Sequence, residues 1–143
     1  MSHLLEQRGA SADFFAPRNN KYPFSEAVRV GQTIYLAGQI GIGPDGLVAG
    51  FEPQMRQMMN NVAATLKGMG LGMEHLVKCT VFMRDMSRWQ AFNDIYLEYF
   101  DSAVLPARSA FGTPELALGA EAEIECIAYA PEFTANSGAK ATP

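Results

Sequence analysis

The sequence is poor in cysteine, histidine and positive charge, and each shortage excludes a class of protein. Two cysteines cannot build a disulfide framework or a zinc site made of cysteine alone. The two histidines, His3 and His75, lie far apart and near no acidic cluster with metal-ligand spacing, so we expect no metal site. Eleven Lys and Arg against fifteen Asp and Glu residues give a net charge of −4. This balance excludes the dense basic surface that binds nucleic acid or anionic membranes.

Long apolar runs are also missing. No run approaches the length of a membrane-spanning helix, and the first residues lack the apolar centre of a signal peptide. We therefore expect a cytoplasmic protein with reduced thiols. The 143 residues, 48% hydrophobic and 18% charged, predict a single folded domain over 1–143. We expect its ordered core over about 22–131, after a loosely ordered lead-in and before a tail, Glu132 to Pro143, that frays.

Apolar periodicity divides the core into strands and helices. Alternation predicts strands over 28–30, 33–40, 77–83, 107–112 and 121–129. Pro53 is expected at the first position of a helix with the apolar stripe Met55, Met58, Met59, Val62, Leu66 and Met69. Ser87 is expected to cap a second helix, ending near Phe100, with the stripe Trp89, Phe92, Ile95, Tyr96, Tyr99 and Phe100. The order β-β-α-β-α-β-β predicts an α+β sheet with both helices on one face.

Two helices cannot cover both faces of such a sheet, so the alternation also describes an uncovered face. One side of the strands is apolar and suits the helices: Val77, Cys79, Val81 and Met83, with Ile124, Cys126 and Ala128. The other side is mixed: Lys78, Thr80 and Phe82, with Glu121, Glu123, Glu125, Ile127 and Tyr129. A mixed face indicates either a subunit interface with polar pockets or a ligand surface.

Two motifs have plain structural interpretations. The run from Gly41 to Gly46 matches the G-x-G-x-x-G pattern of dinucleotide-binding loops, but Pro44-Asp45 makes a turn and no helix follows directly. Cys79 and Cys126 fall on the helix-facing side of their strands, where a free cysteine behaves as a small, inert hydrophobe. We therefore predict a turn and two buried thiols.

Arg108 and the glutamates of the last strand could carry chemistry, and spacing leaves two interpretations open. A guanidinium never deprotonates at useful pH and captures planar carboxylates with two parallel hydrogen bonds. Arg108 could therefore bind a ligand, or it could balance Glu121, Glu123 and Glu125 in a ladder shared with Lys78 or Arg84. A glutamate covered by a second subunit would gain proton affinity and become a candidate acid or base.

Six segments, taken together and in order, form a specific pattern. They are Pro23-Phe24-Ser25-Glu26-Ala27-Val28, Leu36-Ala37-Gly38-Gln39-Ile40, Val81-Phe82-Met83-Arg84-Asp85-Met86, Phe92-Asn93-Asp94-Ile95-Tyr96 with Phe100, Pro106-Ala107-Arg108-Ser109 and Glu123-Ile124-Glu125-Cys126-Ile127-Ala128. This pattern, over about Pro23 to Ala128, resembles the Rid (RidA/YjgF) family of small trimeric enamine/imine deaminases, once named L-PSP endoribonucleases.

The resemblance implies a fold, an assembly and a site. The fold is a chorismate-mutase-like α+β domain with a mixed β-sheet and two helices on one face. The assembly is a homotrimer whose sheets form a central barrel with active clefts between neighbours. Arg108 would bind the substrate carboxylate, Glu123 would help to hold the attacking water, Asn93 would line the site and the main chain at Ala110 would contact ligand and water. No metal and no organic cofactor is implied.

Three positions differ from deaminase-active members of that family. Phe24 stands where those members have tyrosine, Ala37 where they have serine, and Ala110 where cysteine is frequent. Phe24 and Ala37 each remove a hydroxyl from a substrate-binding position, while the carboxylate clamp and the water-holding glutamate are kept. These differences favour a specialised, more apolar substrate.

The leading hypothesis is hydrolytic deamination of 2-imino acids or their enamine tautomers to 2-keto acids and ammonia. The second is a non-catalytic trimeric sensor that binds small carboxylates through Arg108, favoured by the missing hydroxyls at Phe24 and Ala37. The third, a ribonuclease, is disfavoured by the acidic balance and by the absence of a histidine pair.

Overall fold

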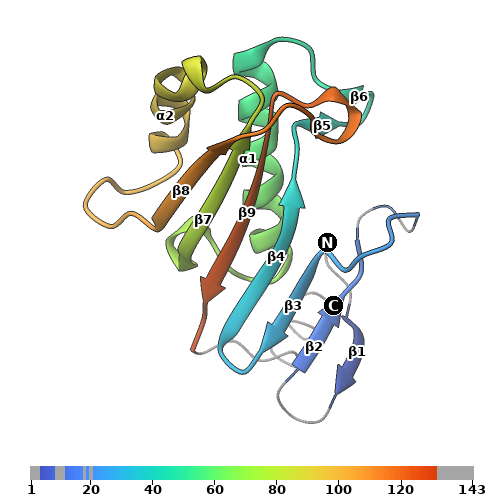
Figure 1. The fold of residues 1–143 in the computed structure, drawn as a ribbon. Helices are drawn as coiled ribbons and strands as arrows, with labels where there is room; N and C mark the ends of the chain where they lie inside the picture. The colour runs from blue at the N-terminus through green and yellow to red at the C-terminus, as the bar shows by residue number, and fades with distance from the viewer. Residues whose placement is uncertain (1–3, 9–11, 18, 20, 132–143) are drawn as a thin grey trace.

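A mixed seven-stranded sheet carries two helices on one of its faces (Figure 1). The computed structural model describes residues 4–8, 12–17, 19 and 21–131. The strands lie in the order β1-β2-β3-β4-β9-β7-β8, and within the described residues β7 and β8 pair in parallel while the other neighbours are antiparallel. The predicted α+β fold is confirmed.

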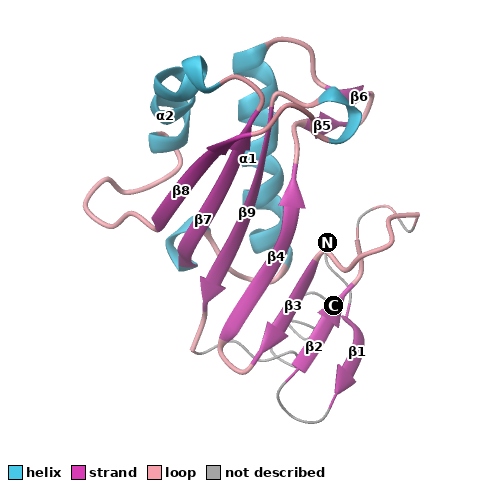
Figure 2. Ribbon diagram, viewed as in Figure 1, coloured by secondary structure: helices cyan, strands magenta, loops and turns pink. Residues whose placement is uncertain are grey.

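The elements follow the predicted order, with additions at the N-terminus and after β4 (Figure 2). The sheet strands are β1 (Leu4–Arg8), β2 (Ala12–Phe15), β3 (Ala27–Val30), β4 (Thr33–Gln39), β7 (Leu76–Met83), β8 (Ala107–Gly112) and β9 (Ala122–Tyr129). A separate hairpin is formed by β5 (Ile42–Gly43) and β6 (Gly46–Leu47). The helices are α1 (Phe51–Gly68) and α2 (Trp89–Leu97), with short 3-10 turns η1 (Met73–His75), η2 (Met86–Arg88) and η3 (Ala117–Gly119). The hairpin confirms that the glycine motif is a turn.

The N-terminal segment is part of the sheet, so the prediction of a loosely ordered lead-in is wrong for β1 and β2. Strand β2 pairs with β3 and places Asp13 directly opposite Arg29. Both side chains are buried, and Arg29 Nε donates a 2.5 Å hydrogen bond to Asp13 Oδ2. The apolar alternation of this short strand is interrupted because a charged residue, Asp13, occupies a buried position. Its partner Arg29 lies on another strand, so the local sequence does not show that the charge is neutralised. The predicted fraying tail, 132–143, lies outside the described residues.

The two helices cover the apolar face of the sheet. In α1 the predicted stripe is buried, with Met55, Met58 and Leu66 fully so. Three predictions about the helices are wrong. The helix α1 begins at Phe51, and Pro53 sits inside its first turn, where backbone N–H groups have no helical acceptor in any case. Asp85 rather than Ser87 caps the start of the second helical region, and Trp89 is 43% exposed instead of buried.

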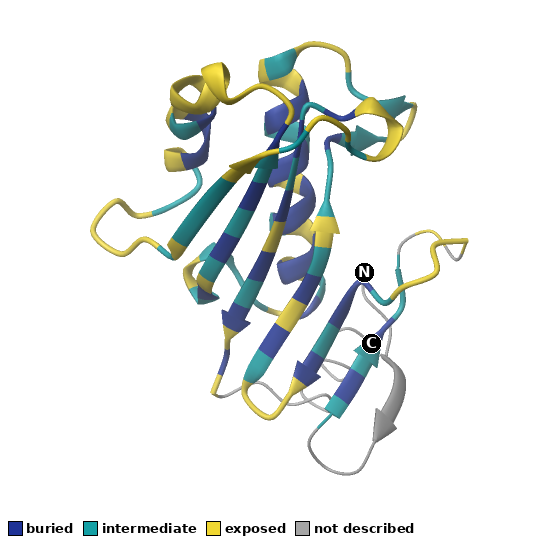
Figure 3. Cartoon of the chain, in the orientation of Figure 1, coloured by how far each residue is buried: buried dark blue, intermediate teal, exposed yellow. Residues whose placement is uncertain are grey.

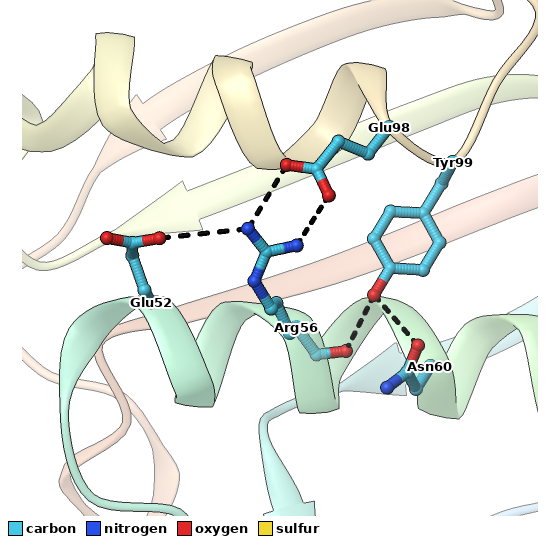
Figure 4. A network of polar contacts seen from close by, with 5 residues as sticks. All are labelled: Glu52, Arg56, Asn60, Glu98 and Tyr99. Carbon is cyan, nitrogen blue, oxygen red and sulfur yellow. Dashed lines mark hydrogen bonds and ion pairs between the residues drawn. The ribbon is translucent and has the colours of Figure 1, made fainter.

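A polar network joins the two helices on the outside of the molecule (Figure 4). Arg56 of α1 donates to both carboxylate oxygens of Glu98 at 2.6 and 3.1 Å, and lies 3.7 Å from Glu52. The hydroxyl of Tyr99 donates to the main-chain oxygen of Arg56 and to Oδ1 of Asn60. These groups are largely solvent-accessible, so the network orients the end of α2 on α1 more than it stabilises the fold.

Burial alternates along the central strands, as the bands in Figure 3 show. In β9 the alternation is the predicted one, with Glu123 and Ile127 on the side away from the helices. In β7 an irregularity in the pairing between Leu76 and Lys78 turns Val77 outward, where it is 47% exposed. Leu76 takes the core position predicted for Val77. A bulge of this kind leaves no local trace in an apolar run.

The uncovered face carries large apolar side chains. Tyr35, Phe111 and Tyr129 are about half exposed, at 49%, 54% and 48%. They share this face with Phe82 and Ile127, because each stands in register with a neighbour on the same side of the sheet. Exposed apolar surface of this extent is typical of a contact with another protein molecule. Among the described residues, no helix has both the length and the apolar character needed to cross a membrane.

Candidate functional site

A pocket of about 1310 Å³ opens at the end of the sheet where β4 leads into the β5–β6 hairpin. Its walls come from the segment before β3, the end of β4, the hairpin, α1 and the η3 turn. Phe24, Ala37 and Glu123, which are three of the residues named from the sequence, all line this pocket. They come from three separate parts of the chain, and sheet pairing brings them together.

Glu123 contributes a carboxylate to this pocket. It is partly buried on β9, and within the described part of the chain its carboxylate makes no hydrogen bond or ion pair. Burial, assisted by the negative charge of Glu125, raises the pKa of Glu123 above its ordinary value of 4.5. Such a group holds its proton longer than a solvated glutamate, which suits general acid–base work.

Gly38 makes room for this carboxylate. A Cβ atom at position 38 would lie 2.3 Å from Glu123 Oε2, and strand β4 is irregularly paired with β9 between Leu36 and Gln39. The glycine therefore lets a bulky acid lie against the backbone of the neighbouring strand. Any other residue here would push the Glu123 side chain away from its place.

Of the three glutamates that could form a salt-bridged ladder, Glu121 has an ion pair among the described residues. Glu121 lies 3.8 Å from Arg84, whose guanidinium also donates to the main-chain oxygen of Gly119. Lys78 instead donates to the hydroxyl of Ser109 at 3.3 Å. Arg108 forms no ion pair with the glutamates within the described residues, so balancing a charge ladder does not explain its position.

Arg108 is held by α2 instead. Its Nη2 donates a 2.6 Å hydrogen bond to Oδ1 of Asn93, and its guanidinium lies 4.6 Å from the ring centre of Tyr96 and 5.5 Å from that of Phe92. A guanidinium carries five N–H donors, so one bond to Asn93 leaves others for a ligand. The rings fix the plane of the fork by cation–π contact. Asn93 and Arg108 are thus brought together as predicted residues of one site, with Ala110 following on the same strand.

Tyr96 is a residue that the sequence reasoning assigned to the core alone. Its ring is buried beneath Arg108, and burial together with the nearby Cys79 thiol raises the pKa of its hydroxyl. The helical spacing of Asn93 and Tyr96, three residues apart, is the signal that could have placed both on the face that meets Arg108.

The two cysteines lie beneath this arginine. Cys79 and Cys126 are opposite one another on β7 and β9, with their sulfur atoms 3.2 Å apart. Both are buried and unbridged, as predicted. The hydrogen bond to Cys79 and burial raise the pKa of Cys126, so the thiol form is kept. This thiol pair forms part of the core under the arginine.

The clamp and the carboxylate face opposite sides of the sheet. Arg108 pairs in register with Cys79, on the helix-covered side, whereas Glu123 pairs with Phe82, on the open side. Between them lie two strand spacings across the sheet and three residues along it. These offsets put the two Cα atoms about 14 Å apart, with side chains that diverge. One small carboxylate cannot touch both groups of a single chain.

No cluster of three or more His, Cys, Asp or Glu side chains suited to a metal ion occurs among the residues that the structure describes.

Comparisons with known proteins identify relatives of this chain. The family described as Endoribonuclease L-PSP matches residues 16–130. A RutC family protein of Aquifex aeolicus is 44% identical over 109 residues, covering 74% of this chain and 87% of the relative. The human 2-iminobutanoate/2-iminopropanoate deaminase is 36% identical over 118 residues, covering 80% of this chain and 85% of the relative.

A solved structure extends the likeness to the fold. The crystal structure of Escherichia coli TdcF with bound serine superposes with a TM-score of 0.71 at 30% sequence identity. The match covers 76% of this chain and 88% of that chain.

Proposed function

The chain belongs to the endoribonuclease L-PSP family, and on that premise we propose that it hydrolyses 2-imino acids to 2-keto acids and ammonia at a site shared by two copies of the chain. Relatives at this level of identity carry the name 2-iminobutanoate/2-iminopropanoate deaminase. The observation that carries the shared site is the placement of Arg108 and Glu123 on opposite sides of one sheet.

Arg108 binds the substrate carboxylate in this mechanism. Asn93 occupies one donor of the guanidinium and the ring of Tyr96 fixes its plane, so the remaining donors form a fork that matches a planar carboxylate. The main chain at Ala110, two residues further along β8, lies beside the bound acid. Binding through the carboxylate sets the imine carbon at a fixed distance from the clamp.

Glu123 of a neighbouring copy handles the water. It accepts a proton as the water oxygen bonds to the carbon of the protonated imine, and this addition gives a carbinolamine. The same carboxyl then returns the proton to the nitrogen. As the C–N bond breaks, the carboxylate takes the proton of the carbinolamine hydroxyl, so that the keto group forms and ammonia leaves. That proton finally passes to the ammonia, which departs as ammonium and restores the carboxylate. The raised pKa of Glu123 favours this exchange, because the carboxyl must both take up and release a proton.

We infer that three copies assemble through the uncovered sheet face. Tyr35, Phe111 and Tyr129 would be covered in such a ring, and a cyclic arrangement repeats the same contact without leaving an open end. Light scattering should give three times the chain mass. A stable monomer at micromolar concentration would overturn both the assembly and the shared site.

The test of function uses imino acids made fresh from amino acids by an L-amino acid oxidase, with semicarbazide present to trap the imine. An active protein lowers semicarbazone formation, because it hydrolyses the imine before semicarbazide can trap it. Glu123→Gln should abolish this activity, whereas Glu125→Gln, one alternation further along β9 and more exposed, should retain it. Equal loss in both variants would contradict the assignment of Glu123.

A second function is favoured by one observation. Phe24 and Ala37 line the pocket without a hydroxyl, while the Arg108 clamp is intact. A protein that binds 2-keto acids tightly, but does not lower semicarbazone formation from any imino acid, would be a small-carboxylate sensor.

A further inference from the structure

Two asparagines that line the pocket are already engaged in hydrogen bonds with the protein. Asn61 donates to the main-chain oxygens of Ile40 and Ile42 at 3.0 and 2.9 Å, and accepts from Gln57 at 2.8 Å. Asn60 accepts from the hydroxyl of Tyr99 at 2.8 Å. These bonds hold the wall between α1 and the hairpin, so they leave few groups to bind a polar substrate side chain.

An aromatic pair forms one wall of the same pocket. Tyr22 and Phe24 lie with ring centres 5.3 Å apart and ring planes only 11° from parallel. Both rings line the pocket, and they are 39% and 49% exposed. Aromatic rings of this kind bind best to another ring, in an offset stack or edge to face.

Leu118 adds a second apolar wall at some conformational cost. Its φ of 58° lies in the left-handed region, which a leucine rarely adopts. Hydrogen bonds on either side hold the turn: Gly119 N donates to Leu116 O, and Arg84 donates to Gly119 O. The turn directs a large, 68% exposed apolar side chain to the pocket. Strain held in this way frequently marks a functional position.

We propose that this site selects imino acids with an aromatic side chain, which stacks on Tyr22 and Phe24 and packs against Leu118. The inference rests on the proposed deamination and names its substrate class. The volume of about 1310 Å³ in the single chain exceeds what a short-chain imino acid fills. Tyr22 and Leu118 are specificity-determining residues in this proposal, because they touch only the side chain of the substrate.

The experiment compares imino acids generated from phenylalanine, leucine and 2-aminobutyrate. For the wild-type protein, kcat/KM for the imino acid made from phenylalanine should be about tenfold or more above kcat/KM for the imino acid made from 2-aminobutyrate. Tyr22→Ala and Leu118→Ala should each lower this ratio about tenfold. Tyr22→Leu, which keeps bulk without a ring, should reduce the preference for phenylalanine over leucine. Leu97→Ala, a half-exposed site on α2 outside the pocket, should leave every ratio unchanged.

Calorimetric titration with phenylpyruvate and 2-ketobutyrate gives a second measurement that needs no turnover. Phenylpyruvate binding that is tighter than 2-ketobutyrate binding, and that weakens about tenfold in Tyr22→Ala, supports the substrate class. If the same result is found but no imino acid is hydrolysed, the aromatic preference is supported and the proposed deamination is overturned. Hydrolysis with a short-chain preference, and ratios unmoved by Tyr22→Ala and Leu118→Ala, overturns the substrate class and leaves deamination intact. Absence of both hydrolysis and binding overturns both.

Discussion

Mixing two inactive variants of this chain should restore activity, because the two groups that perform the proposed chemistry cannot meet within one copy. Arg108→Ala removes the clamp and Glu123→Gln removes the proton carrier. Each pure variant should be inactive. Loss of the bidentate clamp from a desolvated site costs roughly 2–5 kcal/mol, or about thirtyfold to several thousandfold in binding. Arg108→Lys should recover little of it, since an ammonium lacks the planar fork.

The size of the recovery follows from the geometry. Arg108 and Glu123 point to opposite sides of the sheet, about 14 Å apart at Cα, so each site takes the arginine of one copy and the glutamate of another. In a ring assembled at random from equal amounts of both variants, a site is intact when the right copy stands on each side. This happens for about one site in four.

The assay is co-refolding of the two variants from urea, followed by the semicarbazide-coupled measurement. Activity should approach one quarter of that of refolded wild type. The control replaces Glu123→Gln by the double variant Arg108→Ala/Glu123→Gln, which supplies no arginine to any site and should give no recovery. Hybrid rings detected by native mass spectrometry with no more activity than the separate variants would refute the shared site.

Three further predictions concern single features of the chain. Because the pKa of Glu123 is raised in the folded state, the folded protein binds more protons than the unfolded chain above the ordinary glutamate pKa, and its stability falls as pH rises through that range. Glu123→Gln should therefore melt above wild type at neutral pH and lose this advantage below pH 4.5, as calorimetric scans at several pH values would show; an equal advantage at every pH would contradict it. Asp13→Ala should lower the free energy of unfolding by about 3 kcal/mol in urea titration, since it leaves Arg29 buried without a counter-charge, and a cost under about 1 kcal/mol would contradict a buried pair. Cys79 and Cys126 should resist a thiol reagent in the native protein and react fully in urea, and rapid labelling of the folded chain would be inconsistent with their burial.

Periodicity predicted most of the fold because burial follows it closely in the long elements. The apolar stripe of α1 and the alternation of β9 are visible in the sequence. In the helix every third to fourth residue packs against the core, and in the strand every second residue does. Strand β2 was missed because its central residue is an aspartate whose partner, Arg29, lies on another strand. Val77 was misplaced because a bulge depends on the pairing of two strands.

The site shows the same division. Arg108, Asn93 and Glu123 were named from a family resemblance, and Arg108 meets Asn93 as expected. The separation of Arg108 and Asn93 from Glu123 could not be seen in the residues themselves. It depends on the order of the strands in the sheet, which places β7 between β8 and β9. The left-handed backbone of Leu118 was not predicted, since the turn is held partly by Arg84, which is distant in the sequence.

The order of the strands in the chain also sets the order in which the two half-sites can form during synthesis. The clamp lies within one continuous stretch, β7-α2-β8, whose contacts close short loops. The pocket needs β9, the final sheet strand, to enter between β4 and β7, and this pairing joins residues as distant as Thr33 and Tyr129. During synthesis the residues of the proposed clamp are therefore made before Glu123, the proposed proton carrier. Among the described strands β9 is the last to be made, so a chain that ends before β9 lacks one of the two proposed reacting groups.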